Sequence, residues 1–242
     1  YRERTVGKIF LAIAGVGQFM ASHATRHHVL VATPEDHASS RMGETLYHFG
    51  AKRQQPGFFR ESWKVEKQRA SRGGWSVWSL KNETLQQYLM TIGLFAALTI
   101  VFGWIVLPML LIQMYICWWY LSLIEYCQHY GMKRDLKEDG SYKLATAQHS
   151  WNTNMLASNN LLLNFVRHSP HHSRSTRWYQ ALRDEEKAPV LPYCYSLMFL
   201  AAMVPPLYFR LIDQREVSWA GGNMQKINFH PPSEERLRRK FG

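Results

Sequence analysis

The sequence predicts an all-α fold, a membrane helical bundle that contains a transmembrane helical hairpin. Three observations favour it. A long central stretch, residues 84–124, contains no Asp, Glu, Lys, Arg or His. The chain is basic, with a net charge of +11, and carries 9 Trp, 12 Tyr and 12 Phe, residues that suit a membrane surface. Histidines recur in groups with helical spacing on both sides of the apolar stretch. We expect all 242 residues to form a single domain.

The first expected element is a mostly apolar helix over Val6–Ser22. About 17 residues is marginal for a membrane span, so this helix either crosses the bilayer or is buried beside other helices. The chain has no initiating Met and opens as though within a helix. We therefore expect an N-terminally truncated fragment. Further on, Glu61–Arg72 is dense in charge and predicts a helix in water or at the interface.

The transmembrane hairpin is expected over residues 85–124. About 40 uncharged residues are too many for one helix across the ~30 Å hydrocarbon core. Breaks near Gly103 and Pro108 divide them into two helices, Leu85–Phe102 and Trp104–Ile124. Both outer flanks are rich in Lys and Arg, which predicts that they lie on the cytoplasmic side. The alternative is a buried hairpin in a soluble helical bundle.

Seven of the eleven histidines form two groups of three and one isolated position. One group has the spacing i, i+4, i+5 and the other i, i+3, i+4, so side chains of each share a helical face. Imidazole is a common metal ligand; a histidine-rich solvated loop is the alternative. The isolated histidine follows the apolar stretch by about one turn. The expected metal ligands are His23, His27, His28, His129, His168, His171 and His172. Three or four ligands satisfy one zinc ion, so seven histidines indicate two metal ions. The sequence therefore predicts a cytoplasmic, histidine-rich face that binds two metals.

Other polar residues near these groups are expected to support the metal ligands. Metal-bound imidazoles usually donate their outer N–H to a carboxylate, carbonyl or other acceptor. His149 is predicted for this role, with direct ligation as its alternative, and Asp184 is predicted with an ordinary surface carboxylate as its alternative. Asn152 is a third candidate, and it opens a helix expected over Asn152–Phe165. Pro189–Phe209 is apolar with prolines at both ends, which favours a short or interfacial helix.

Other functional classes are disfavoured. The three cysteines form no CxxC pair and are interpreted as small hydrophobic residues, not as a disulfide framework or a thiolate zinc site. The Lys and Arg residues flank apolar stretches and form no aromatic stacking platform, which argues against a nucleic-acid partner.

Several motifs in this chain resemble those of the integral-membrane alkane 1-monooxygenases, within the wider membrane desaturase and hydroxylase superfamily. The family is marked by Glu-His-x-x-Gly-His-His, Asn-Tyr-x-Glu-His-Tyr-Gly and Leu-Gln-Arg-His-x-Asp-His-His. The matching stretches here are Ser22–His28, Glu125–Gly131 and Phe165–His172. Shorter matches extend the resemblance over nearly the whole chain. They are Val31–Asp36, Ser40–Glu44, Ser76–Trp78, His149–Asn152, Tyr179–Asp184 and Trp219–Gly222.

The resemblance implies a non-haem enzyme with two iron ions that inserts one oxygen atom from O₂ into a terminal C–H bond of an n-alkane. It implies electrons from rubredoxin or a ferredoxin-type carrier, and a multi-pass position in the bacterial inner membrane. Such carriers are usually acidic, which suits a basic cytoplasmic face. A lipid-soluble hydrocarbon could reach such a site from the bilayer.

The chain also departs from the family pattern. Ser22, Arg26, Gln128 and Pro170 replace the family's Glu, Gly, Glu and Asp. These changes leave every matching histidine in place, and Gln128 joins the candidates that support a ligand. Gln128 also resembles the xylene-type enzymes, which keeps aromatic methyl hydroxylation as an alternative. Lipid desaturation and a zinc-stabilised membrane scaffold are further alternatives. The family's His-Glu-x-x-His motif is absent, so we expect this fragment alone to be inactive.

Overall fold

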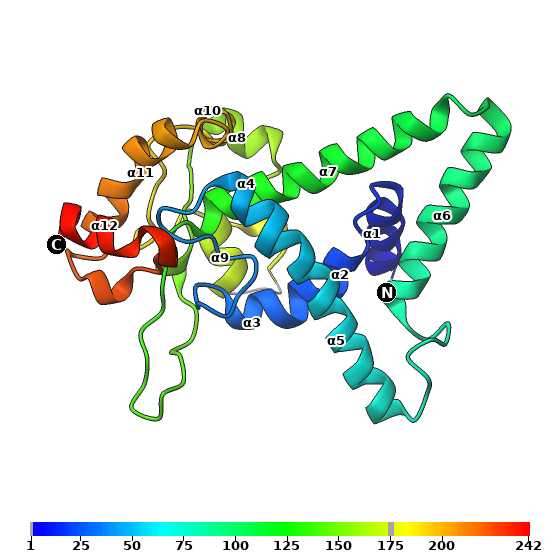
Figure 1. Ribbon diagram of the computed structural model, residues 1–242, viewed down its shortest axis with the longest axis horizontal. Coiled ribbons are helices and arrows are strands. Elements are labelled where there is room, and N and C mark those ends of the chain that lie inside the picture. The colour runs from blue at the N-terminus through cyan, green and yellow to red at the C-terminus, as the bar shows by residue number, and fades with distance from the viewer. Residues whose placement is uncertain (1, 174–176) are drawn as a thin grey trace. The chain divides into compact units, whose positions relative to one another are not determined.

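The computed structural model describes residues 2–173 and 177–242, and it is helical, as the sequence predicted (Figure 1). The α-helices are α1 (Arg2–Ile13), α2 (Gln18–Ser22), α3 (His28–Leu30), α4 (Leu46–His48), α5 (Gln55–Gly73), α6 (Glu83–Phe102), α7 (Val106–His129), α8 (Leu156–Leu161), α9 (His168–Ser173), α10 (Tyr195–Ala202), α11 (Pro205–Trp219) and α12 (Pro231–Phe241). Within the described ranges there are also two π-helical turns, His23–His27 and Phe49–Gln54, and three 3₁₀ turns, Ala147–His149, Tyr179–Ala181 and Met224–Lys226.

The chain divides into two compact units, which we describe separately. The first unit contains Tyr1–His27 and Gln54–Leu121, and the second contains His28–Arg53 and Ser122–Gly242. The first therefore holds α1, α2, α5, α6 and most of α7, and the second holds α3, α4, the last turns of α7 and the helices that follow it. A single domain over the whole chain stays a prediction.

The N-terminal helix of the first unit is interrupted where the sequence predicted continuity. α1 ends at Ile13 and α2 begins at Gln18, because Gly15 adopts a φ of +71°, which a helix does not accommodate. The exposed carbonyl of Gly15 accepts a hydrogen bond from Trp118 Nε1 at 2.9 Å, and that of Ala12 accepts one from Thr91 Oγ1 at 2.7 Å. The break is thus stabilised by α6 and α7.

The start of α6 has strong helix-initiating chemistry. Asn82 Oδ1 accepts hydrogen bonds from the backbone N–H groups of Thr84 at 2.9 Å and Leu85 at 3.1 Å, as an N-cap does. The carboxylate of Glu83 lies in the first turn, where the helix dipole favours a negative charge. Arg4 contacts this carboxylate at 2.6 Å and joins α1 to α6.

α6 and α7 are the candidate membrane spans. Both are long and apolar enough to cross a bilayer, and the three-residue connection at 103–105 joins them (Figure 1). Gly103 ends α6 with a φ of +86°, as its position in the sequence predicted. Ile100 of α6 is 83% exposed and Ile112 of α7 is 60% exposed, so both helices present apolar side chains that the core helix of a soluble protein would bury.

In the second unit, the loop before α4 is attached to the last turns of α7. Ser40 Oγ donates a hydrogen bond to the carbonyl of Tyr126 at 2.7 Å, and the Tyr126 hydroxyl donates to the carbonyl of Glu44 at 2.6 Å. Both α7 contacts are buried. The two bonds hold residues 40–44 along the helix end in a fixed register.

Tyr130, the first residue after α7, connects three segments of the second unit. Its buried hydroxyl accepts a hydrogen bond from the Gly43 N–H at 2.7 Å and donates one to Asp213 Oδ1 of α11 at 2.9 Å. The next residue, Gly131, has a φ of +76°, and a Cβ there would lie 2.7 Å from Glu216 Cγ. A glycine is therefore required where the chain leaves the helix.

The expected helix over Asn152–Phe165 is wrong in extent. Only α8, Leu156–Leu161, is helical, and Leu163 and Asn164 adopt positive φ values of 50° and 60°. Asn152 instead pairs with another extended segment, because its N–H donates to the carbonyl of Pro189 at 2.8 Å and its carbonyl accepts from the N–H of Leu191 at 2.8 Å. The segment 189–209 divides into α10 and the start of α11 at Pro205.

The Asp213–Tyr130 contact predicts a pH dependence of stability. Burial raises the pKa of Asp213 to about 6, although the Tyr130 hydrogen bond opposes the shift. The folded protein then binds more protons than the unfolded chain between about pH 4 and pH 6, so stability falls as the pH rises through this window. Asp213→Asn keeps an acceptor for Tyr130 without the charge. We expect it to raise stability at pH 7 by about 2 kcal/mol.

The measurement is the thermal unfolding midpoint in detergent between pH 4.5 and pH 7.5. Asp139→Asn is the matched control, because Asp139 is exposed. A pH profile for Asp213→Asn that matches the unsubstituted protein would show that this carboxyl does not carry the effect.

Candidate metal centre

Most of the predicted histidine ligands gather in the second unit. His28 opens α3, His129 ends α7, and α9 carries the remaining three. The His28 ring lies 4.7 Å from that of His171 and 4.5 Å from that of His172, measured between ring centroids. The His129 ring lies 5.0 Å from those of His168 and His172. Segments far apart in the sequence therefore bring five imidazoles into one continuous group.

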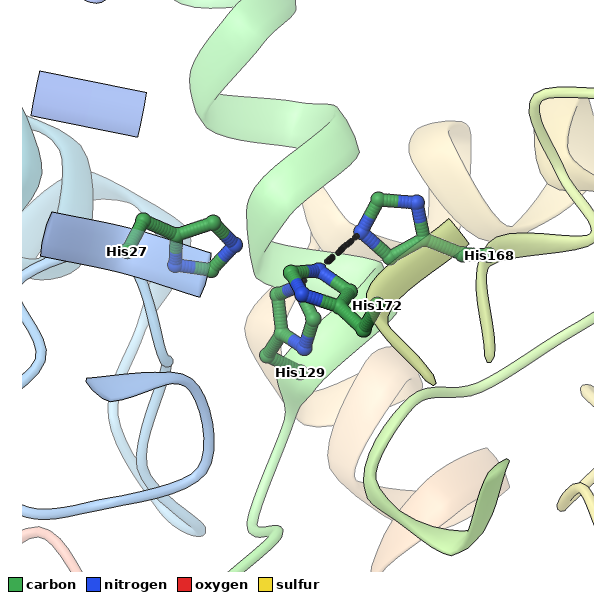
Figure 2. Close-up of side chains that lie close together, drawn as sticks. All are labelled: His27, His129, His168 and His172. Atoms are coloured by element: carbon green, nitrogen blue, oxygen red, sulfur yellow. Dashed lines mark hydrogen bonds between the residues drawn. The ribbon is translucent and has the colours of Figure 1, made fainter. Parts of the chain in front are cut away.

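Three of these imidazoles turn their Nε2 atoms toward one another. His168 Nε2 lies 2.8 Å from His172 Nε2 and 3.2 Å from His129 Nε2, and Figure 2 shows the three rings together. His129 and His168 are completely buried, and His172 is 8% exposed. The spacing of His168 and His172, four residues apart on α9, places both on one helical face, as the sequence predicted.

His129 is oriented through its other ring nitrogen. Nδ1 lies 3.3 Å from the backbone carbonyl of His149 and 3.3 Å from Ser150 Oγ. A hydrogen on Nδ1 that is donated to the carbonyl leaves the lone pair on Nε2, which faces His168. Because a backbone carbonyl can only accept a hydrogen bond, the His149 contact orients the ring and favours the tautomer that a metal ligand requires.

His149 thus contributes its backbone to the centre, although the sequence predicted a side-chain role. Its own ring Nδ1 accepts a hydrogen bond from the Thr146 N–H at 2.9 Å. Burial, reinforced by the positive charge of Arg134, lowers the pKa of His149 to about 4, so the ring is neutral at pH 7. A neutral ring is the form that can accept this bond.

Asn152 positions α9 itself. Its Oδ1 accepts hydrogen bonds from the backbone N–H groups of His168 and Ser169, each at 2.9 Å, and from Ser169 Oγ at 3.1 Å. These are the N–H groups that a helix start leaves without an internal partner. The sequence singled out Asn152 as an acceptor for an imidazole; the structure shows it as an acceptor for the backbone that carries the imidazoles.

The geometry of the three buried rings fits a metal ion. Metal–nitrogen bonds of about 2.1 Å place neighbouring ligand nitrogens roughly 3.0 to 3.4 Å apart in octahedral or tetrahedral coordination. The observed separations of 2.8 and 3.2 Å are close to this range. The donors come from two helices whose ends are held by the contacts of His129 and Asn152, so the arrangement is preorganised.

His23 and His27 belong to the first unit, in the π-helical turn that precedes α3. Their ring centroids are 5.0 Å apart, and Phe19 stacks on His23 at 4.3 Å. The i, i+4 spacing therefore places the two rings together, as expected. Ligation by His23 and His27 stays a prediction.

One acidic residue of the site was overlooked in the sequence. Glu125 Oε2 lies 3.8 Å from His129 Nε2, and the Glu125 side chain is 2% exposed. The signal was present, since Glu125 and His129 are four residues apart on α7 and so share a face. A buried carboxylate beside imidazoles adds an oxygen donor to the nitrogen donors.

The two remaining candidates differ in burial. Gln128 is completely buried, and its backbone carbonyl accepts a hydrogen bond from the Trp151 N–H at 2.7 Å. Asp184 is exposed, a position that favours the alternative of an ordinary surface carboxylate. A supporting role for either side chain stays a prediction.

An all-helical chain with two candidate spans and a buried group of imidazoles defines a histidine-rich membrane protein. A family model described as "Fatty acid desaturase" matches residues 2–201. The chain belongs to the fatty acid desaturase family.

Individual relatives are similar over nearly the whole chain. The alkane 1-monooxygenase of Ectopseudomonas oleovorans is 45% identical over 99% of this chain and 60% of its own length. Alkane 1-monooxygenase 1 of Alcanivorax borkumensis is 44% identical over 99% of this chain and 59% of its own length. A more distant relative, the hydroxylase component of the xylene/toluene monooxygenase of Pseudomonas putida, is 30% identical over 79% of this chain and 50% of its own length. The chain spans about 60% of the length of the first relative.

The role of Asn152 can be tested without a metal. Asn152→Ala removes the acceptor for two backbone N–H groups of α9, which should destabilise that helix locally by about 1–2 kcal/mol. We expect amide exchange in residues 168–173 to accelerate roughly 5- to 30-fold. Hydrogen exchange followed by mass spectrometry measures this. Asn154→Ala, at an exposed position, is the control; equal exchange in the two variants would contradict the assignment.

Proposed function

We propose that this chain forms part of a membrane non-haem di-iron monooxygenase that hydroxylates terminal C–H bonds of n-alkanes to 1-alkanols with O₂. The observation that carries the proposal is the 45% identity to an alkane 1-monooxygenase over 99% of the chain. The convergence of three buried Nε2 atoms supports it, because such a site can hold a redox metal within a helical scaffold.

The proposed iron ligands are the histidines that the sequence singled out: His23, His27, His28, His129, His168, His171 and His172. Two iron ions bound there would supply the redox chemistry that activates O₂. The protein itself holds and orients the ligands. The His149 carbonyl directs the lone pair of His129 inward, and Asn152 fixes the start of α9. Burial of His129 and His168 keeps bulk water away from the reaction.

The apolar surface and the positive charge of the chain support the proposed substrate route and electron donor. A hydrocarbon dissolves in the bilayer, and α6 and α7 present apolar surface to it. We propose that the substrate enters from the lipid. Electrons would come from rubredoxin or a ferredoxin-type carrier, and the net charge of +11 favours association with an acidic protein. The proposed location is the bacterial inner membrane, with the metal centre on the cytoplasmic side.

The test uses the full-length gene product, purified in detergent and assayed with a rubredoxin, its reductase, NADH and octane. We expect about two irons per chain and formation of 1-octanol. His168→Ala should lower bound iron and reduce hydroxylation at least 100-fold, because His168 Nε2 lies 3.2 Å from that of His129 and 2.8 Å from that of His172. Asn154→Ala, at an exposed position, is expected to retain both properties. Unchanged iron and activity in His168→Ala would exclude the proposed centre.

Aromatic methyl hydroxylation is the second candidate, favoured by the relative from the xylene/toluene monooxygenase. The same preparation separates the two, because octane gives 1-octanol and xylene gives a methylbenzyl alcohol. Turnover of xylene at least tenfold above that of octane would assign the aromatic reaction. An alkene as product would indicate desaturation instead.

A further inference from the structure

A second group of side chains of the types that bind metals lies in the second unit, separate from the histidine motifs. Glu44 precedes α4, His48 is the last residue of α4, and His230 is the N-cap residue of α12. Each of the three side chains offers one donor atom, and these atoms lie within 4.8 Å of one another. Nothing in the proposed hydroxylation uses this group.

The three side chains face one another. His48 Nδ1 lies 2.8 Å from Glu44 Oε1, and the rings of His48 and His230 are 4.7 Å apart between centroids. His230 Nδ1 is buried and forms no hydrogen bond within the described part of the chain. A buried ring nitrogen without a hydrogen bond is unfavourable unless a ligand or water satisfies it.

The carboxylate of Glu44 has one oxygen available for this group. Glu44 Oε2 accepts hydrogen bonds from Arg53 Nη1 at 2.6 Å and from the Arg41 N–H at 3.1 Å. Oε1 faces His48. Because Glu44 is completely buried and held by Arg53, its carboxylate is fixed in place before any ion arrives.

The backbone holds the two sides of the group together. Met42 and Phe229 form a bridge, with the His230 N–H donating to the Met42 carbonyl at 2.9 Å. Ser233 Oγ donates to the Gly43 carbonyl at 3.2 Å. The His48 side chain is 42% exposed, so its ring can rotate to bring the donors closer. The site therefore combines a fixed carboxylate, a positioned His230 and an adjustable His48.

We infer that Glu44, His48 and His230 form a binding site for a divalent transition-metal ion, with Zn²⁺ as the expected occupant. Two imidazoles and one carboxylate are a recurring donor set for zinc, and water can complete the coordination. The bound ion would cross-link the loop at 41–48 to the start of α12, which are more than 180 residues apart in the sequence. Its role would be to stabilise the attachment of the C-terminal helix.

The test measures bound zinc and local hydrogen exchange in chelator-treated, detergent-purified full-length protein, with and without added Zn²⁺. We expect His230→Gln and His48→Gln each to lose one zinc equivalent relative to the unsubstituted protein. Glu235→Gln on the same helix is the control, because Glu235 is exposed. His168→Ala should retain the zinc equivalent that His230→Gln loses.

Zinc should also slow amide exchange severalfold in residues 42–48 and 228–237 of the unsubstituted protein, but not of His230→Gln. Zinc-dependent exchange in the unsubstituted protein locates the bound ion by itself. The inference can therefore be tested even if a variant folds poorly. Equal zinc content in the unsubstituted protein and His230→Gln, or exchange in these segments that zinc does not alter, would overturn the inference. Failure of alkane hydroxylation would leave both measurements unaffected.

Discussion

The buried last turn of α7 is the constraint on which the second unit depends. Ser40 bonds to the Tyr126 carbonyl, Trp151 bonds to the carbonyls of Gln128 and Tyr130, and Gly43 bonds to the Tyr130 hydroxyl. The carbonyls of Tyr126 and Gln128 lie in the last turn, where backbone carbonyls have no partner within the helix. The other contacts involve the carbonyl and the hydroxyl of Tyr130, the residue that follows the helix. The same turn carries His129, so the bonds that satisfy the helix end also fix a candidate ligand.

Local sequence signals predicted the features that depend on local spacing. The i, i+3, i+4 pattern of α9 and the i, i+4 pair His23–His27 place their rings together because helical periodicity alone decides this. Gly103 predicted the end of α6, since a positive φ there requires glycine. The apolar run predicted both candidate spans, because length and composition are properties of the segment itself and do not depend on distant contacts.

Features that arise from long-range contacts could not be predicted from the sequence. Asn152 looked like a helix start, but the backbone partners that define its place, Pro189 and Leu191, lie almost 40 residues further on. The role of the His149 carbonyl could not be read from a side-chain pattern, because every residue has a carbonyl. The triad Glu44, His48 and His230 was missed for a similar reason, since only the folded chain joins residues 44 and 230.

The length of α7 also sets the distance between the turn at 103–105 and His129. Its 24 residues extend about 36 Å, slightly more than the ~30 Å hydrocarbon core. If α7 spans the bilayer, the number of residues between the turn at 103–105 and His129 therefore determines how far His129 lies from the hydrocarbon core. Removing one residue from the apolar part would shift His129 by about 1.5 Å and rotate it by about 100°. An insertion or deletion in this helix would therefore move His129 away from the imidazoles of α9, whereas a substitution that keeps the helix length would leave His129 in place.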